Sequence, residues 1–213
     1  MIKYYPLNLS LENKKCVVLG AGAVALRKIR RLLECGSRVL VISQEITPQL
    51  KKLFGQKKIV FKNKRAGLGD LKGAFLVVAA TDDRKLNALA SAYCLKNNIL
   101  VNVVDSPQEC SFILPAVLRR GSLNISVSTD GLSPALARKI RQDIQQRYGP
   151  EYAKLLRLLK IIRPLALKKI KLPRARNLFF QRIFEPKILA FLKKNKQRAA
   201  KKIIMEYLED AQR

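Results

Sequence analysis

The chain has 213 residues, of which 48% are hydrophobic and 27% charged, a balance that excludes a generally disordered protein. Its 43 lysines and arginines against 15 acidic residues give a net charge of +28. Such a chain is expected to attract polyanions, whether nucleic acid, an acidic membrane face or a multiply carboxylated or phosphorylated small molecule. It contains no histidine, which excludes histidine-based catalytic triads and histidine-ligated metal sites.

The length of the apolar runs and the spacing of the cysteines bear on membrane insertion, secretion and disulfide formation. The longest apolar run, residues 74–80, is far shorter than the roughly 18 residues that suggest a membrane span, and the start of the chain has no apolar signal core. The cysteines show no Cys-x-x-Cys spacing: Cys16, Cys35, Cys94 and Cys110. We therefore expect reduced thiols in a cytoplasmic protein, with neither disulfides nor a metal site.

The first half of the chain alternates between strand and helix patterns. Short apolar runs predict strands at residues 15–20, 38–42, 58–61, 74–80 and 99–105. Apolar positions at helical spacing predict helices at residues 23–34, 46–54 and 84–97. Because continuously apolar strands that alternate with helices are typical of a covered parallel sheet, we predict an α/β fold with a Rossmann-type sheet.

The next segment has a different pattern. Residues 112–119 and 123–128 predict two strands joined by a tight turn, and such a hairpin is antiparallel. Ser133 and Pro134 then open a predicted helix that ends near residue 148, with the serine as N-cap and the proline in the first turn. A small α+β element therefore follows the parallel sheet.

The remaining residues, 151–213, show only helical patterns. We expect these helices to break at three prolines, Pro164, Pro173 and Pro186. The basic excess is denser here, since residues 135–213 carry 22 basic and 6 acidic residues, against 21 and 9 in residues 1–134. Such charge is typical either of solvated helical faces or of a surface that binds polyanions.

A glycine-rich turn follows the first predicted strand, with the pattern G-x-G-x-x-A. Gly20 permits a tight turn, Gly22 lets the backbone approach a pyrophosphate, and Ala25 allows the helix to pack closely. The N-terminus of the next helix then presents free N–H groups to the phosphates. Since the motif directly follows a strand in a βαβ unit, we predict that it binds a dinucleotide. A packing turn without a cofactor is the alternative.

The end of the second predicted strand lacks the acid that usually holds the ribose of NAD. Ile42 is followed by Ser43, Gln44 and Glu45. Ser43 or Gln44 is placed for the ribose contact, and Glu45, two positions late, is an alternative cap for the next helix. The choice between NAD and NADP does not follow from this strand.

Two further strand ends carry polar residues at the same predicted edge of the sheet. Thr81 is placed to touch a cofactor, whereas Asp82 and Asp83 have the pattern of a helix cap. Asp105 ends the fifth strand beside the predicted cleft, where a partly desolvated carboxylate is a candidate proton shuttle. An Asx-turn before Pro107 is the alternative role of Asp105.

Six pieces of sequence between about residue 4 and residue 148 occur together in a specific order. They are Tyr-Pro-Leu-Asn-Leu, Val-Leu-Gly-Ala-Gly-Ala-Val-Ala-x-Arg-Lys, Ala-Ala-Thr-Asp-Asp, Val-Asn-Val-Val-Asp-Ser-Pro, Ser-Phe-Ile-Leu-Pro-Ala and Ser-Val-Ser-Thr-Asp-Gly-Leu-Ser-Pro-Ala-Leu-Ala-Arg. Together they closely resemble the precorrin-2 dehydrogenase family, which includes the N-terminal part of bacterial siroheme synthase. The C-terminal helices match this family only in length and character.

The resemblance implies a specific reaction, the oxidation of precorrin-2 to sirohydrochlorin with NAD as cofactor, in sirohaem biosynthesis. Some family members also insert Fe²⁺ into sirohydrochlorin, so Fe²⁺ is a further implied substrate. Family members are homodimers whose middle segment exchanges between subunits. Precorrin-2 is multiply carboxylated, which agrees with the strongly cationic chain. The methyltransferase step of the pathway is expected on another protein, because the length of the chain leaves no room for that domain.

The resemblance also implies roles for individual residues. Asp105 matches the family's central acid and is the predicted catalytic residue. The predicted cofactor contacts are Gly20, Gly22, Ala23, Val24, Ser43, Gln44, Glu45, Thr81, Asn102 and Val103. The predicted lining of the tetrapyrrole pocket is Ser128, Thr129, Gly131 and Ser133. Asp130 departs from the small residues that are usual in that segment.

We therefore predict a Rossmann domain at residues 1–112, a dimerisation region at 113–149 and a basic helical domain at 150–213. Two alternatives from other classes stay open. A basic nucleic-acid-binding protein on a Rossmann scaffold is supported by the charged tail, but the chain lacks an aromatic-rich β platform and a recognised recognition helix. A nucleotide-sensing domain would bind the cofactor without catalysis. Neither a membrane nor a specific nucleic acid is a predicted partner.

Overall fold

The computed structural model describes residues 4–212 and divides into two compact units, Met1–Leu114 and Pro115–Arg213. Residues 1–3, part of the segment searched for a signal core, lie outside the described residues. Among residues 4–212, no helix is both long enough and apolar enough to cross a membrane. The predicted division of the second unit, near residue 150, stays a prediction.

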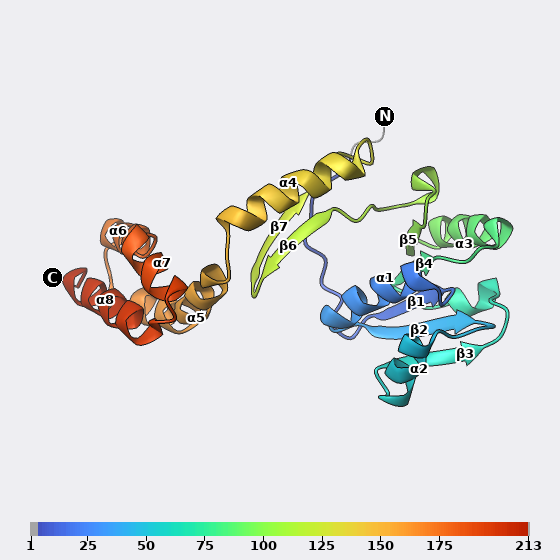
Figure 1. Ribbon diagram of the computed structural model, residues 1–213, viewed down its shortest axis with the longest axis horizontal. Coiled ribbons are helices and arrows are strands. Elements are labelled where there is room, and N and C mark those ends of the chain that lie inside the picture. Colours follow the sequence, from blue (N-terminus) through green and yellow to red (C-terminus); the bar gives the residue numbers. More distant parts are fainter. Residues whose placement is uncertain (1–3, 213) are drawn as a thin grey trace. The chain divides into compact units, whose positions relative to one another are not determined.

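The first unit is a five-stranded parallel sheet with helices on both faces (Figure 1). Its elements in chain order are β1 (Lys15–Leu19), α1 (Ala23–Glu34), β2 (Arg38–Ser43), α2 (Pro48–Gly55), β3 (Ile59–Asn63), η1 (Leu68–Leu71), β4 (Leu76–Ala79), α3 (Arg84–Lys96), β5 (Leu100–Val103) and η2 (Pro107–Glu109). The strand order is β3-β2-β1-β4-β5, and every pair is parallel. The predicted Rossmann-type fold is confirmed.

The apolar runs of the strands are explained by burial on both faces of the sheet. Val18 of β1 packs with Ile29 of α1 on one face, and Val17 packs with Ala90 of α3 on the other. All residues of β4 are buried. Alternate residues of the central strands β1 and β4 therefore enter two separate cores, which is why these strands lack a polar face, whereas the edge strand β3 is largely exposed.

The second unit begins with an antiparallel hairpin and continues with helices (Figure 1). Its elements are β6 (Ala116–Arg120), β7 (Leu123–Val127), α4 (Pro134–Arg147), α5 (Glu151–Lys169), α6 (Pro173–Arg182), α7 (Pro186–Lys193) and α8 (Gln197–Asp210). The first strand of the hairpin starts later than predicted, because Phe112 packs against the core of the first unit instead.

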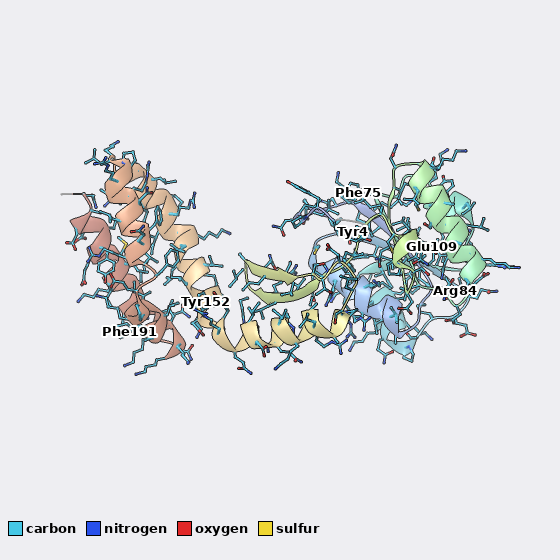
Figure 2. All side chains as sticks on the ribbon, turned by 90° about the horizontal axis from the view of Figure 1, so that it is seen from above. Tyr4, Phe75, Arg84, Glu109, Tyr152 and Phe191 are labelled. Atoms are coloured by element: carbon cyan, nitrogen blue, oxygen red, sulfur yellow. The ribbon has the colours of Figure 1, made fainter. Side chains whose placement is uncertain are left out.

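Helices α5 to α8 share one apolar core. Its fully buried members include Leu155, Ile162, Phe179, Ile188, Leu192, Ile204 and Leu208. Phe191 of α7 packs against this core, and the ring of Tyr152 contacts that of Tyr148 with centroids 5.0 Å apart (Figure 2). The tail is therefore a folded helical unit with its charged side chains outside.

The predicted helix break at Pro164 is wrong, since this residue lies inside α5. A proline in a helix interior costs about 3 kcal/mol. Ile162 and Ala166, on either side of it, are buried in the helical core, and this packing offsets the cost. Pro173 and Pro186 instead occupy the first turns of α6 and α7, where a missing N–H breaks no helical hydrogen bond.

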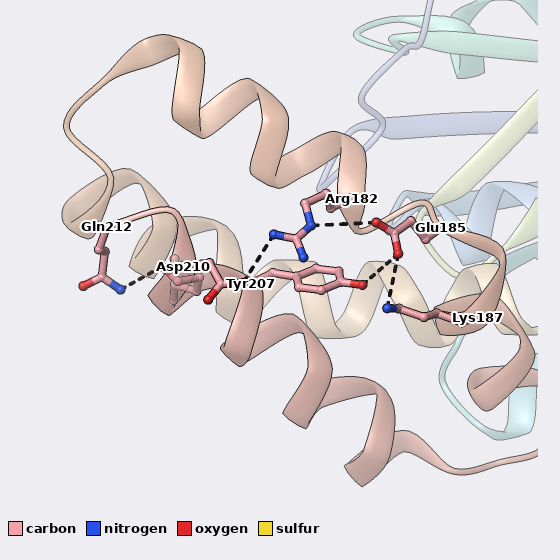
Figure 3. Close-up of polar contacts among 7 residues, drawn as sticks. Arg182, Glu185, Lys187, Tyr207, Asp210 and Gln212 are labelled. Atoms are coloured by element: carbon pink, nitrogen blue, oxygen red, sulfur yellow. Dashed lines mark hydrogen bonds and ion pairs between the residues drawn. The ribbon is translucent and has the colours of Figure 1, made fainter.

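A polar cluster around Tyr207 ties α6, α7 and α8 together (Figure 3). The Arg182 guanidinium lies 3.7 Å from the centroid of the Tyr207 ring, and the Tyr207 hydroxyl donates to a Glu185 carboxylate oxygen at 2.7 Å. This hydrogen bond, together with the Lys187 ammonium, lowers the pKa of Glu185. Because Glu185 directly precedes α7, the cluster fixes the turn between α6 and α7 against α8.

We expect Cys16 and Cys94 to be inert in the folded protein. Both side chains are fully buried, and burial raises the pKa of both thiols, that of Cys94 to about 11. Little thiolate forms at such sites, and the thiolate is the reactive species. Ellman's reagent at mildly alkaline pH, followed by mass spectrometry, should label neither residue before guanidinium is added. Rapid labelling of either one in the folded chain would contradict this burial.

Candidate functional site

A cavity of about 620 Å³ lies at the carboxyl edge of the parallel sheet. Its volume is typical of small-molecule and cofactor sites. Predicted cofactor residues that line this cavity are Gly20, Gly22, Ala23, Val24, Ser43, Gln44, Glu45 and Thr81. They come from the ends of β1, β2 and β4, which the sequence separates but the sheet brings together.

The position of the cavity follows from the strand register. Leu19, the last residue of β1, lies between Ile42 of β2 and Ala79 of β4. Gly20 N then donates to Ile42 O at 2.9 Å, and Ala80 N donates to Leu19 O at 2.9 Å. The chain continues from β1 to β2 on one side, whereas β4 pairs on the other. Such a switch point is where open α/β sheets bind their ligands.

The two glycines of the turn have different roles. Gly20 has φ +95°, and a Cβ there would lie 2.2 Å from the Ala80 carbonyl oxygen, so only glycine fits. Gly22 has an ordinary φ of −76°, and a Cβ there would meet no atom of the described chain within 4 Å. Since Gly22 also lines the cavity, its missing side chain leaves space for a ligand rather than for the protein.

The N-terminus of α1 is free to bind an anion. Gly22 is its N-cap and offers no side chain, and the first turn contains no acidic residue. The helical hydrogen bonds begin with Leu26 N to Gly22 O, so the N–H groups of Ala23 and Val24 point out of the helix end, and both residues line the cavity. A pyrophosphate fits this cradle, because the helix end supplies both N–H donors and a favourable dipole.

The end of β2 forms another wall of the cavity. Glu45 lines the cavity, and its N–H donates to Ser43 Oγ at 3.4 Å. The N-cap position of α2 is Thr47, so the alternative of Glu45 as the cap is wrong. Thr47 Oγ1 also faces this region: it is buried and, within residues 4–212, makes no hydrogen bond. Its hydroxyl is thus available to a ligand.

The cavity is also lined by Thr47, Lys64 and Arg65, which no pattern in the sequence predicts. A threonine before a proline is the usual start of a helix, so nothing marks Thr47 as unusual. Lys64 and Arg65 follow β3 and pair with Asp70 at 2.7 Å and with Asp83 at 3.2 Å. In so basic a chain, no local signal separates these two cations from the others.

The segment after β4 lines the cavity and also provides the cap of the next helix. Asp83 accepts from Leu86 N at 3.0 Å and is the N-cap of α3. This hydrogen bond, with help from Arg65, lowers the pKa of Asp83. The prediction of a cap is therefore right for Asp83 and wrong for Asp82, which lines the cavity without capping the helix. The Thr81 hydroxyl donates to Asn87 Oδ1 at 2.7 Å.

Asn102 and Val103 of β5 are buried, with 7% and 4% of their surfaces exposed, and they do not line the cavity. Asn102 Oδ1 accepts from Lys28 Nζ at 2.7 Å, and Asn102 Nδ2 donates to Phe112 O at 3.2 Å. Val103 packs in the core on the α3 side of the sheet. The contact of these two residues with the cofactor stays a prediction.

Asp105 is exposed, so the expected partial desolvation of its carboxylate is wrong. The hydrogen-bond ladder of the sheet ends at Val104, whose N–H donates to Ala79 O at 2.9 Å. Asp105 then has φ +58°, a left-handed conformation that aspartate tolerates better than most residues and that turns the chain away from the sheet. Within residues 4–212 its carboxylate accepts no hydrogen bond, so the alternative Asx-turn is not formed.

The predicted tetrapyrrole-binding residues lie in the loop between β7 and α4 of the second unit. Ser133 is the N-cap of α4, as predicted, and accepts from Leu136 N at 3.2 Å. Thr129 Oγ1 accepts from Ser133 N at 3.0 Å, and Ser128 Oγ accepts from Asp130 N at 3.1 Å. Asp130 is exposed. The loop is therefore held by its own hydroxyl groups, and its role in substrate binding stays a prediction.

Most of the first unit matches a known protein family. Residues 7–116 fit the model of a family described as NAD(P)-binding. The chain belongs to this NAD(P)-binding family. The predicted cofactor class, a nicotinamide dinucleotide, is thereby confirmed. Residues 120–147 fit a second model, described as the central part of sirohaem biosynthesis proteins. The second match covers the hairpin turn, β7 and α4.

Known relatives of this NAD(P)-binding chain include siroheme synthases. That of Methylococcus capsulatus is 34% identical over 210 residues, which are 99% of this chain and 44% of the relative. That of Ectopseudomonas mendocina is 35% identical over 210 residues, which are 99% of this chain and 45% of the relative. The chain therefore spans less than half the length of these relatives.

A solved structure also resembles this member of the NAD(P)-binding family. SirC, a precorrin-2 dehydrogenase, matches with a TM-score of 0.80 and 27% sequence identity, over 96% of this chain and 100% of SirC. The match thus includes both units. The resemblance to the precorrin-2 dehydrogenase family, inferred from the ordered motifs, is confirmed.

Proposed function

We propose that this chain oxidises precorrin-2 to sirohydrochlorin, with NAD⁺ as the acceptor of the hydride. The observation that carries the proposal is the match with SirC, since it covers both units of the chain. A nucleotide-sensing domain would account for the first unit alone. The cavity at the β1–α1 turn supports the choice of cofactor. Gly22 has no side chain to fill the space there, and no side chain caps the N–H groups at the start of α1, so a pyrophosphate suits this site.

The chain's own residues would bind both reactants and accept a proton. Bound NAD⁺ supplies the hydride acceptor. The N–H groups of Ala23 and Val24 hold the pyrophosphate, and the side chains after β2 contact a ribose. Asp105 accepts the proton that leaves the substrate when the hydride is lost, and because this carboxylate is exposed it returns the proton to water. The loop with Ser128 and Thr129 contacts the macrocycle.

Insertion of Fe²⁺ into sirohydrochlorin is the second proposed activity, with Fe²⁺ as a substrate. Among residues 4–212 no group of three or more His, Cys, Asp or Glu side chains is placed to hold a metal ion. The macrocycle would therefore supply the ligands to the iron. Asp105 would accept the pyrrole protons that Fe²⁺ displaces. We also propose a cytosolic location, since buried thiols such as Cys94 are typical of reducing compartments.

Anaerobic incubation of the purified chain with precorrin-2 and NAD⁺, followed by absorbance, tests this proposal. We expect sirohydrochlorin and NADH to appear in equal amounts. Addition of Fe²⁺ afterwards should give the spectrum of sirohaem, and an unchanged spectrum would refute the second activity. A chain that binds NAD⁺ but leaves the precorrin-2 spectrum unchanged would be a nucleotide sensor, and the proposal would be wrong.

We further propose that the chain forms a homodimer through the second unit. The apolar side chains of Leu132, Leu136 and Ile140 lie four residues apart and are 70%, 50% and 37% exposed. This spacing places Leu136 and Ile140 on one face of α4. The hairpin of β6 and β7 is a two-stranded sheet on which α4 packs, and its two outer edges pair with no further strand within residues 4–212. A second copy of the chain would cover both features.

Replacing Leu136 by aspartate should convert the dimer into a folded monomer. The new carboxylate would lie in the centre of the apolar face, where burial without a partner is unfavourable. Leu89→Asp is the matched control, since Leu89 is 57% exposed on α3 of the first unit. Size-exclusion chromatography with light scattering measures the mass, and circular dichroism checks the helices. A monomeric wild-type chain, or a dimeric Leu136→Asp variant, would refute this interface.

A further inference from the structure

Lys28 of α1 is a half-buried cation that the proposed reaction does not yet use. Its ammonium donates to Asn102 Oδ1 at 2.7 Å, and so bridges α1 to β5. Side chains in a helix lean towards its N-terminus, which in α1 is the end at the cavity. Asn102 is itself fixed, because its amide donates to Phe112 O at 3.2 Å. The ammonium is thus held in place on the β5 side of the sheet edge.

The charge of Lys28 is not balanced by an ion pair within residues 4–212. Burial lowers the pKa of Lys28, and the positive charges of Arg27 and Arg31 on the same helix lower it further. Cys110 and Asp105 raise this pKa, but they offset only part of the effect. An ammonium has three N–H donors, and in the described chain Asn102 accepts from one of them. A desolvated cation with unused donors favours an anionic partner.

We propose that Lys28 binds a carboxylate of the tetrapyrrole substrate beside Asp105. The inference rests on the proposed function. Lys28 does not line the cavity of the dinucleotide, so the pyrophosphate at Gly22 is not the expected partner. A substrate with a carboxylate on each ring offers many partners, and an ammonium–carboxylate contact is a strong, charge-assisted hydrogen bond. One such contact would orient the macrocycle relative to Asp105.

Steady-state kinetics of three variants test this role. Lys28→Met removes the charge while keeping most of the side-chain length, Lys28→Arg keeps the charge, and Arg30→Met removes an exposed cation from the same helix. Loss of a hydrogen bond to a charged group corresponds to at least about a tenfold change, so we expect Lys28→Met to raise KM for precorrin-2 by that factor. Lys28→Arg should restore most of the affinity, and Arg30→Met should resemble the wild type.

Binding of uroporphyrin, a tetrapyrrole with carboxylates on every ring, gives a readout without turnover. We expect Lys28→Met to weaken its binding while the Kd for NAD⁺ stays unchanged and the Tm falls slightly, because Asn102 Oδ1 loses one hydrogen bond. If the wild type binds uroporphyrin through Lys28 but does not oxidise precorrin-2, the proposed function fails and this inference stands. Unchanged KM and uroporphyrin affinity in Lys28→Met would overturn it. Equal losses of affinity in Lys28→Met and Lys28→Arg, matched by equal falls in Tm, would also overturn it, because they indicate that Lys28 acts only as a structural bridge to Asn102.

Discussion

Replacing Gly22 by aspartate should abolish dinucleotide binding and leave the fold intact. Gly22 has an ordinary φ, a Cβ there meets no atom of the described chain within 4 Å, and aspartate is a favourable N-cap for α1. The same carboxylate would stand where the N–H groups of Ala23 and Val24 are expected to hold a pyrophosphate. Two like charges about 4 Å apart near a protein surface repel by about 4 kcal/mol, so the Kd for NAD⁺ should rise by at least about a hundredfold.

Isothermal titration with NAD⁺ measures this loss, and thermal melting measures the fold. Gly22→Asn is the matched control, because asparagine has the size and the capping ability of aspartate without its charge. We expect it to weaken binding much less than Gly22→Asp does. A Gly22→Asp variant that melts like the wild type and still binds NAD⁺ with nearly the same Kd would show that the phosphates lie elsewhere.

Replacing Asp105 by asparagine should lower the turnover of precorrin-2 strongly and leave NAD⁺ binding unchanged. Asparagine keeps the shape of the side chain and tolerates the left-handed backbone at φ +58°, so the fold should not be strained. It cannot accept a proton at ordinary pH. A positioned general base contributes about 10²–10⁴-fold to a rate, and we expect a loss of at least tenfold. Asp105 does not line the dinucleotide cavity, so the Kd for NAD⁺ should not change.

NADH formation under anaerobic conditions measures this turnover. Glu109→Gln is the control, because Glu109 is a carboxylate in η2, near Asp105 in the sequence. We expect the control to turn over like the wild type. Asp105→Asn turnover within twofold of the wild type would remove Asp105 from the reaction and leave orientation of the substrate as the source of the rate.

The sequence predicts the fold and the cavity well because both depend on local patterns. Strands apolar on both faces alternate with helices, and only a covered parallel sheet buries them. Once the strands are parallel, their carboxyl ends meet, and Gly20, Ser43 and Thr81 are brought to one edge. The G-x-G-x-x-A spacing then predicts which strand end approaches the dinucleotide.

The predictions from sequence that are wrong, and the contacts that it misses, concern features that depend on tertiary structure or on a single backbone angle. Asp105 follows an apolar strand, but one left-handed residue places its carboxylate in water instead of beside the core. Pro164 stays helical because the packing of its neighbours outweighs its intrinsic preference. Asn102 lies on the face of β5 that meets α1, and its partner Lys28 is far away in the sequence. No local pattern reports such a pairing.

Titration of the purified wild-type chain with NADH, followed by the fluorescence of the nicotinamide, decides whether the turn between β1 and α1 holds this cofactor. We predict saturable binding at one site per chain and competition by NAD⁺. Absence of saturable binding by either nucleotide, in a chain whose circular dichroism shows the folded α/β structure, would contradict the dinucleotide site and the dehydrogenase function that depends on it.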